Sequence, residues 1–102
     1  MSRDEMAAHA ERVFRRHNQA ETRLLSALQS LSIGQPEAYE ALLEAEAGML
    51  DACEKLNEFA IRRRDNKRMG IIEKRRIPGT IKACDTQTQI VEELLAGMER
   101  AP

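Results

Sequence analysis

Apolar residues recur every three or four positions through the first third of the chain, and this spacing constrains the fold more than any other feature. The recurrence follows alternating steps of four and three along the residues Met6, Ala10, Val13, His17, Ala20, Leu24, Ala27 and Leu31. A row spaced in this way lies along one side of an α-helix and packs against another helix. Ser2 and Glu5 have the spacing of a capping box at the start of that helix. The pattern therefore predicts a helix over residues 2–33.

The same periodicity predicts a second helix over residues 36–69. Gly34 suits the end of the first helix, and Pro36 suits the first turn of the next. A connection this short requires the two helices to lie antiparallel. Beyond Ala60 the heptad positions fall on Arg, Lys and Gly. We therefore expect the helix to leave the core near this point and to end by residue 69.

A basic break or turn is expected over residues 70–79, since proline disfavours helix at the residue before it and Pro78 lies in this stretch. A shorter third helix is expected over residues 80–99, where apolar residues again alternate by three and four. Composition agrees with an all-α domain, because aromatic residues are only 3% of a chain that is 42% hydrophobic. One short helix covers a long hairpin incompletely, so the sequence predicts a bundle completed by homodimerisation.

The net charge of the chain is only −1, but acidic and basic residues are concentrated in different segments. Residues 37–61 hold seven acidic residues against Lys55 alone, a net charge of −6, whereas residues 62–76 hold eight basic residues against two acidic ones, a net charge of +6. If the hairpin folds at residues 34–35, opposite charges face each other across it. The expected pairs are Arg12 with Glu58, Arg16 with Glu54, Arg23 with Glu46, and Glu5 with Arg64. These pairs would fix the register of the hairpin rather than supply much stability.

No residue pattern points to an enzyme, and we expect no catalytic residue, metal or cofactor. The sequence lacks the glycine-rich loops, nucleophile motifs and metal-ligand spacings of known sites. His17 falls on the apolar row and is expected to be buried and hydrogen-bonded within the bundle. Cys53 and Cys84 also fall on apolar rows, where reduced thiols act as small hydrophobic residues.

The N-terminal residues contain no hydrophobic leader, and no apolar run approaches the roughly 18 residues that span a bilayer. A cytoplasmic protein without membrane contact is therefore expected.

The basic block over residues 62–76 and the apolar residues outside the predicted core suggest a surface for a partner. The candidate contact residues are Phe14, Leu25, Arg62, Arg63, Arg64, Arg68, Met69, Ile71, Ile72, Ile90 and Leu94. Arginine and methionine are enriched at protein interfaces. The sequence thus favours a non-enzymatic interaction module, such as a small bacterial-type anti-activator that sequesters a transcription factor. A nucleic-acid-binding accessory protein that uses the basic block is one alternative, and a secretion or flagellar chaperone is another.

Overall fold

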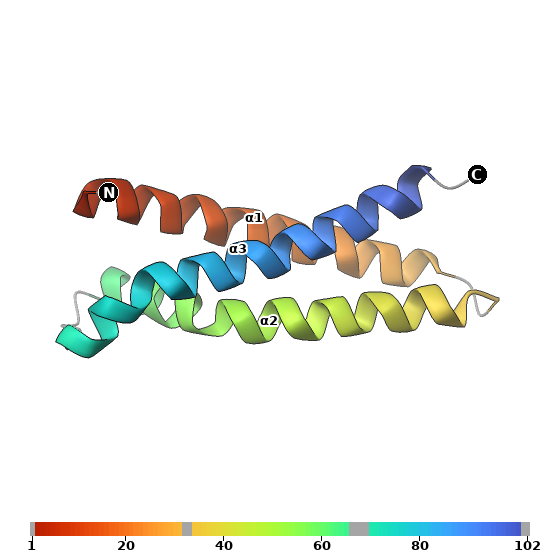
Figure 1. The fold of residues 1–102 in the computed structure, drawn as a ribbon. Helices are drawn as coiled ribbons and strands as arrows, with labels where there is room; N and C mark the ends of the chain where they lie inside the picture. Colours follow the sequence, from red (N-terminus) through yellow and green to blue (C-terminus); the bar gives the residue numbers. More distant parts are fainter. Residues whose placement is uncertain (1, 32–33, 66–69, 101–102) are drawn as a thin grey trace.

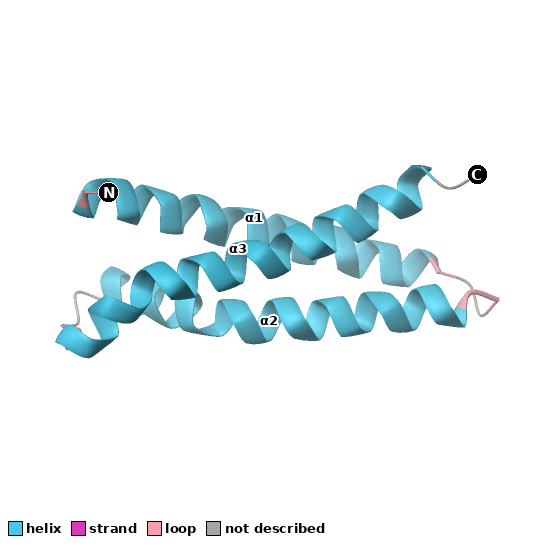
Figure 2. Ribbon diagram, viewed as in Figure 1, coloured by secondary structure: helices cyan, strands magenta, loops and turns pink. Residues whose placement is uncertain are grey.

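The chain forms three long α-helices that lie side by side in a rod of 50 × 20 × 19 Å. The computed structural model describes residues 2–31, 34–65 and 70–100. Its helices are α1 (Arg3–Ser30), α2 (Pro36–Arg64) and α3 (Ile71–Arg100). The chain runs along α1, returns along α2 and runs back along α3 (Figure 1). Helices are the only regular secondary structure in the described ranges (Figure 2), which confirms an all-α fold.

The start of α1 carries the predicted capping box. The backbone N–H of Glu5 donates to Ser2 Oγ at 3.1 Å, and the backbone N–H of Ser2 donates to Glu5 Oε1 at 3.3 Å. The helix ends at Ser30, before the predicted residue 33, because Leu31 adopts an extended conformation. Leu31 still donates its N–H to the carbonyl of Ala27 at 3.1 Å.

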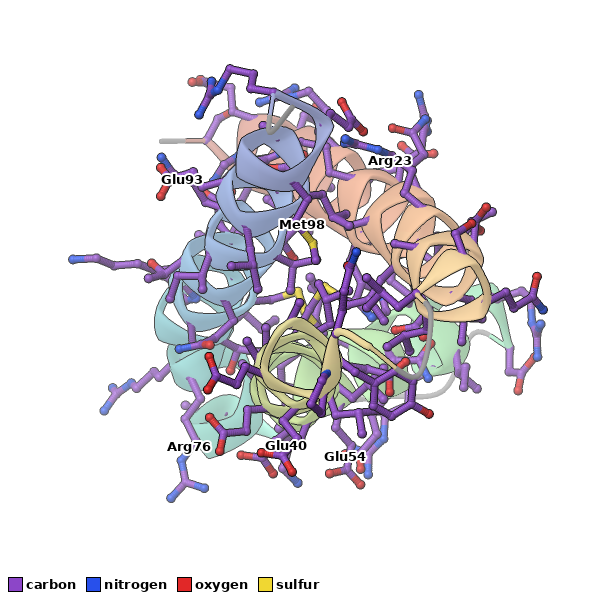
Figure 3. The ribbon with its side chains drawn as sticks, turned by 90° about the vertical axis from the view of Figure 1, so that its right-hand side faces the viewer. Arg23, Glu40, Glu54, Arg76, Glu93 and Met98 are labelled. Carbon is purple, nitrogen blue, oxygen red and sulfur yellow. A yellow bond between two sulfur atoms is a disulfide. The ribbon has the colours of Figure 1, made fainter. Side chains whose placement is uncertain are left out.

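The heptad rows of the three helices meet in one apolar core. Its buried members are Val13, Ala20, Leu24, Leu42, Met49, Cys53, Leu56, Ile81, Cys84, Val91 and Leu95. Figure 3 looks along the rod and shows Met98 directed toward this interior, whereas Glu40 and Glu54 project outward from α2. The periodicity of the sequence therefore located the core side of each helix.

The third helix is longer than the sequence suggested. It begins at Ile71 rather than at residue 80 and has 30 residues, against 28 in α1, so the expectation of a shorter third helix was wrong. Gly70 accepts the first helical hydrogen bond, from the N–H of Lys74 at 3.0 Å, and Ile77 packs against the core. Pro78 is exposed and lacks an N–H for the Lys74 carbonyl, but Lys74 is also exposed, so water can solvate that carbonyl.

Among the described residues, ion pairs connect α1 to α3 rather than to α2. Arg16 binds Glu92 with Nη2–Oε1 at 2.5 Å and also binds Asp85, and Arg23 Nη2 lies 2.9 Å from Glu99 Oε1. The pairings of these two arginines expected across the hairpin were therefore wrong. The hairpin register was drawn with two helices only, and α3 lies along the edge of α1 that carries both arginines.

The other two expected pairs are also not formed in the structure as described. Glu58 Oε2 lies 3.3 Å from Lys55 Nζ, so its described ion pair is with its own helix rather than with Arg12. Arg64 Nε lies 3.4 Å from Asp65 Oδ1, at the end of α2. Both are short-range contacts between neighbours in the sequence, and they say nothing about the register of α1 against α2.

Candidate interaction surface

The apolar residues singled out from the sequence fall on different parts of the bundle. Leu25, Ile71 and Ile90 are exposed. Phe14 and Leu94 are half-buried and pack against the core, so they are less accessible than the sequence suggested. The structure therefore does not gather these five residues into one patch.

Three basic residues of the predicted site, Arg62, Arg63 and Arg64, form the last turn of α2. Arg62 is half-buried, and Arg64 is exposed and paired with Asp65. Arg68 and Met69 lie outside the described residues, as do the side chains of Arg63 and Ile72. Contact of a partner with Met69 and the neighbouring arginines therefore stays a prediction.

A surface that the sequence analysis missed runs along α2. Tyr39, Leu43, Leu50 and Ile61 are 39–44% exposed, although all are large and apolar. They are separated by 4, 7 and 11 residues, so they share one face of the helix. Tyr39 continues the apolar spacing that predicts the second helix, but in the structure it lies at the edge of the core and is exposed.

Leu25 of α1 lies on the matching edge. It is four residues from Glu21, whose carboxyl group is next to Glu46 of α2. Glu46 in turn is three residues from Leu43 and four from Leu50, so the contact between the two acids places these faces together. Leu25, Tyr39, Leu43, Leu50 and Ile61 are called the apolar strip below. Arg16 and Arg23 mark the opposite edge of α1, against α3, so the strip lies on the side that α3 leaves uncovered.

Two carboxyl groups lie at the middle of the apolar strip. Burial, together with a hydrogen bond to the Glu46 carboxyl group and the charge of that group, raises the pKa of Glu21 to about 7. Glu21 Oε2 is buried and has no hydrogen-bond partner among the described residues. Arg23, which the sequence placed beside Glu46, is bound to Glu99 instead. The acidic pair is therefore left without the cation expected for it.

A row of acidic side chains borders the apolar strip on α2. The members of this acidic row are Glu37, Glu40, Glu44, Asp51, Glu54 and Glu58. All except Glu58 are exposed, and Glu58 is paired with Lys55. For the other five, the structure contains no ion pair within its described residues. One side of α2 is thus apolar at its edge and negatively charged beside it.

His17 is buried as expected, but its hydrogen bonding differs from the prediction. Neither ring nitrogen has a hydrogen-bond partner in the part of the chain that is described. Its ring lies 6.1 Å from that of Phe14, and burial lowers the pKa of the imidazole. No group of three or more His, Cys, Asp or Glu side chains converges as around a metal ion among the described residues.

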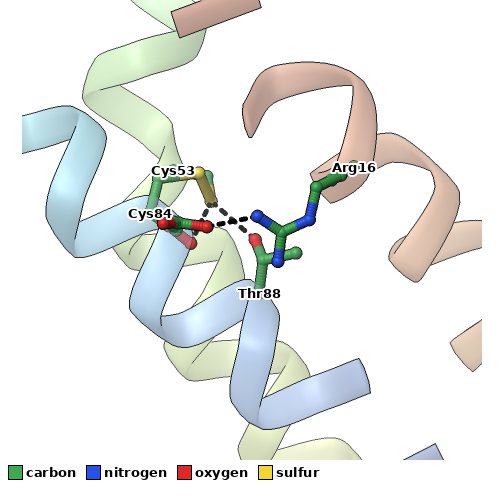
Figure 4. The surroundings of a disulfide bond; sticks show 5 residues. Arg16, Cys53, Cys84 and Thr88 are labelled. Carbon is green, nitrogen blue, oxygen red and sulfur yellow. Dashed lines mark hydrogen bonds and ion pairs between the residues drawn. A yellow bond between two sulfur atoms is a disulfide. The ribbon is translucent and has the colours of Figure 1, made fainter. Parts of the chain in front are cut away.

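Cys53 and Cys84 form a disulfide that joins α2 to α3, so the expectation of two reduced thiols was wrong. Their Cα atoms are 4.5 Å apart, and the bond is buried beside Thr88 (Figure 4). Each cysteine was placed correctly on an apolar row. Their pairing depends on the register between α2 and α3, which periodicity within single helices does not give.

A shallow hollow of about 420 Å³ lies between α2 and α3, near the basic block. Its lining includes Lys55, Arg75, Arg76 and Thr80. Both arginines are exposed, and the lysine is shared with Glu58. Two arginines, a lysine that is paired with Glu58, and a hydroxyl group therefore lie together around this hollow.

In the described ranges, none of the three helices is long and apolar enough to cross a membrane. No family model matches the chain, and comparisons with curated proteins and with solved structures give no match.

Proposed function

We propose that this protein is a non-enzymatic helical interaction module that binds another protein through the apolar strip. The observation that carries the proposal is the exposure of five large apolar side chains on one side of the bundle, each 39–49% accessible to solvent. Large exposed apolar patches on soluble proteins mark sites of contact with other molecules. Within this class we favour a small regulator of the anti-activator kind, which sequesters a partner such as a transcription factor.

The architecture supports a binding role because α3 covers the pair formed by α1 and α2 on one side only. The ion pairs of Arg16 and Arg23 and the disulfide hold α3 against both other helices on that side. The strip on the other side is formed by side chains of two helices, which hold these side chains at defined positions relative to one another. A partner that covers the strip removes apolar surface from water, which favours binding.

The proposal is tested by two charge substitutions at positions of equal exposure. Leu50 in the strip and Ile90 on α3 are both 44% exposed. Ile90 is three residues from Gln87, which approaches Gly48 of α2, so it belongs to the α2–α3 edge, away from the strip. Leu50→Glu is expected to lower affinity for the native partner at least tenfold, and Ile90→Glu to leave it near that of the unmodified protein.

The native partner is first captured by affinity purification and identified by mass spectrometry. Its affinity for each of the three proteins is then measured by titration. Circular dichroism first establishes that both variants remain helical. Equal affinity of Leu50→Glu and the unmodified protein for the partner would contradict the proposal. So would an equal loss of affinity in both variants.

Nucleic-acid binding remains a second candidate because the hollow between α2 and α3 is lined by Lys55, Arg75 and Arg76. Such binding depends strongly on salt, since cations on the protein displace counterions from phosphates. Titration with mixed-sequence DNA and RNA at low and moderate salt tests it, with Arg75→Ala as the variant expected to weaken binding. No binding at low salt would remove this candidate.

A chaperone for a secreted or flagellar subunit would use the same apolar strip. The identity of the captured partner separates this candidate from an anti-activator. A homodimer also stays part of the proposal, and its test is the mass of the protein in solution, considered in the Discussion.

A further inference from the structure

The chemistry around the apolar strip specifies the kind of partner that fits it. Building on the proposed function, we propose that the strip receives an amphipathic helix of another protein that carries a Lys or Arg within its apolar side and further basic residues along one flank. The shape of the strip, the acidic pair and the acidic row each support one part of this description.

A helix fits the shape of the uncovered surface. From Tyr39 to Ile61 the strip follows α2 for about 33 Å at the rise of an α-helix. A partner helix of about 20 residues matches that length and places its apolar positions along the strip at three- and four-residue spacing. It would complete a four-helix arrangement with α3 on the opposite side.

The acidic pair accounts for the basic residue within the apolar side. Glu21 and Glu46 lie between α1 and α2 at the middle of the strip, and the described part of the structure leaves Glu21 Oε2 without a hydrogen-bond partner. A Lys or Arg from the partner supplies charge-assisted hydrogen bonds there and favours the ionised form of Glu21. A purely apolar helix would instead bury the two acids further from water, at a cost in binding free energy.

The acidic row accounts for the basic flank. Five of its six carboxylates have no ion pair among the described residues, and they lie beside the strip along the length of α2. Basic residues on the partner would therefore be attracted to this side of α2, and acidic residues repelled.

A second copy of this chain fits the strip less well. Antiparallel pairing of two copies across their strips puts both acidic rows on the same side of the contact, and residues 37–61 carry a net charge of −6 in each copy. Like charges in such a contact cost free energy. Charge complementarity therefore selects a basic helix rather than a second copy.

Two synthetic 20-residue helices with the same leucine side test the proposal by fluorescence anisotropy. The first peptide has lysines on the flank and one lysine at the centre of the leucine side, and the second has glutamates at those positions. We expect the lysine peptide to bind at least tenfold more tightly than the glutamate peptide. Leu50→Glu is expected to abolish binding of the lysine peptide, whereas the matched control Ile90→Glu retains it.

A third peptide examines the acidic pair. It has the lysine flank but a leucine in place of the central lysine. The variant Glu21→Gln/Glu46→Gln is expected to bind the first peptide about tenfold more weakly than the unmodified protein does, and to bind the third peptide at least as tightly. Unchanged binding of both peptides would overturn the role of the acidic pair.

The remaining outcomes separate this inference from the proposed function. Equal binding of the lysine and glutamate peptides, lost in both cases with Leu50→Glu, would overturn the basic character of the partner but leave the strip as a docking site. Lysine-peptide binding that survives Leu50→Glu would show attraction to the acidic row alone and overturn the inference. A dimer that Leu50→Glu converts to monomer would assign the strip to a second copy.

Discussion

Glu21 is held in a protonation state that differs from that of an ordinary surface glutamate. Its neighbour across the helix interface is Glu46, and the nearby Arg23 is occupied by Glu99. Burial and the neighbouring acid raise the pKa of Glu21 to about 7, whereas an unfolded chain has a glutamate pKa near about 4.3. The folded protein therefore binds more protons than the unfolded chain between these values, and stability falls as the pH rises through this window.

Glu21→Gln is expected to remove this loss of stability. The variant should be more stable than the unmodified protein at pH 8, by about 1 to 2 kcal/mol once solvent contact is taken into account. The difference should shrink toward pH 4.5, where the unmodified Glu21 is also neutral. Urea denaturation at pH 5 and pH 8 measures both values.

Glu40→Gln serves as the control because Glu40 is exposed and has no ion pair within the described residues. It should show no comparable difference between the two pH values. Burial lowers the pKa of His17, so this residue makes the folded protein less stable as the pH falls. The effect is the same in both variants. A Glu21→Gln protein that is less stable than the unmodified protein at pH 8 would contradict the assignment.

At the scale of the helices, periodicity identified which residues are buried but not how the helices begin and pair. The core rows of α1 and α2 were predictable because helix geometry alone puts Val13, Ala20 and Leu24 on one side. The partners of Arg16 and Cys53 were not predictable, because each depends on where α3 lies. The apolar strip was missed for the same reason, since its exposure depends on which side of the hairpin α3 covers.

Pro78 is the reason why the start of the third helix was predicted too late in the chain. The step from Ile77 to Ile81 continues the apolar spacing of α3, and this signal was available in the sequence. The general preference against helix before proline outweighed it. In the structure Pro78 lies inside α3, in its second turn, and it is exposed, so water can solvate the carbonyl that its missing N–H leaves free.

Gly79→Ala tests the early start of α3. Gly79 lies within the helix, and a methyl group at this position would have no atom within 4 Å among the described residues. Alanine is therefore expected to raise the free energy of unfolding by about 0.5 to 1 kcal/mol, through its higher helix propensity. Thermal denaturation followed by circular dichroism measures the gain.

Gly97→Ala is the positive control, since Gly97 is also within α3 and equally unobstructed. Gly70→Ala should give no such gain, because Gly70 precedes the helix. A gain for Gly97→Ala without one for Gly79→Ala would favour the break over residues 70–79 that the sequence suggested.

For the whole molecule, the disulfide is the strongest constraint on unfolding. Cys53 and Cys84 are separated by 31 residues. Closing a loop of that length lowers the entropy of the unfolded chain, which raises its free energy by about 3 to 4 kcal/mol at 25 °C. The bond is buried, so a reductant reaches it only when α2 and α3 separate. Disulfides are typical of oxidising compartments, which counts against the cytoplasmic location expected from the sequence.

Cys53→Ala/Cys84→Ala is therefore expected to lower stability by several kcal/mol while leaving the helices in place. The urea midpoint of the oxidised protein gives the reference value, and reduction of the unmodified protein after unfolding should reproduce the shift. A thiol assay that finds two free cysteines in the native, unreduced protein would contradict the disulfide.

Self-association is a separate question at this scale. The homodimer was inferred from a short third helix, and the 30 residues of α3 weaken that argument. The homodimer stays a prediction, for which light scattering should give twice the chain mass of 11.6 kDa. A mass of one chain at micromolar concentration would remove it, whereas a dimer that persists in Leu50→Glu would place the contact away from the apolar strip.

The disulfide also determines what remains connected if the chain is cut. Cys53 lies in the second half of α2 and Cys84 in the first half of α3, so the link between these helices belongs to a closed covalent ring. One proteolytic cut between the two cysteines opens the ring but leaves both parts of the protein joined through sulfur. A molecule nicked in this segment would run as one species without reductant and as two with it, and the apolar strip would keep its attachment to α3.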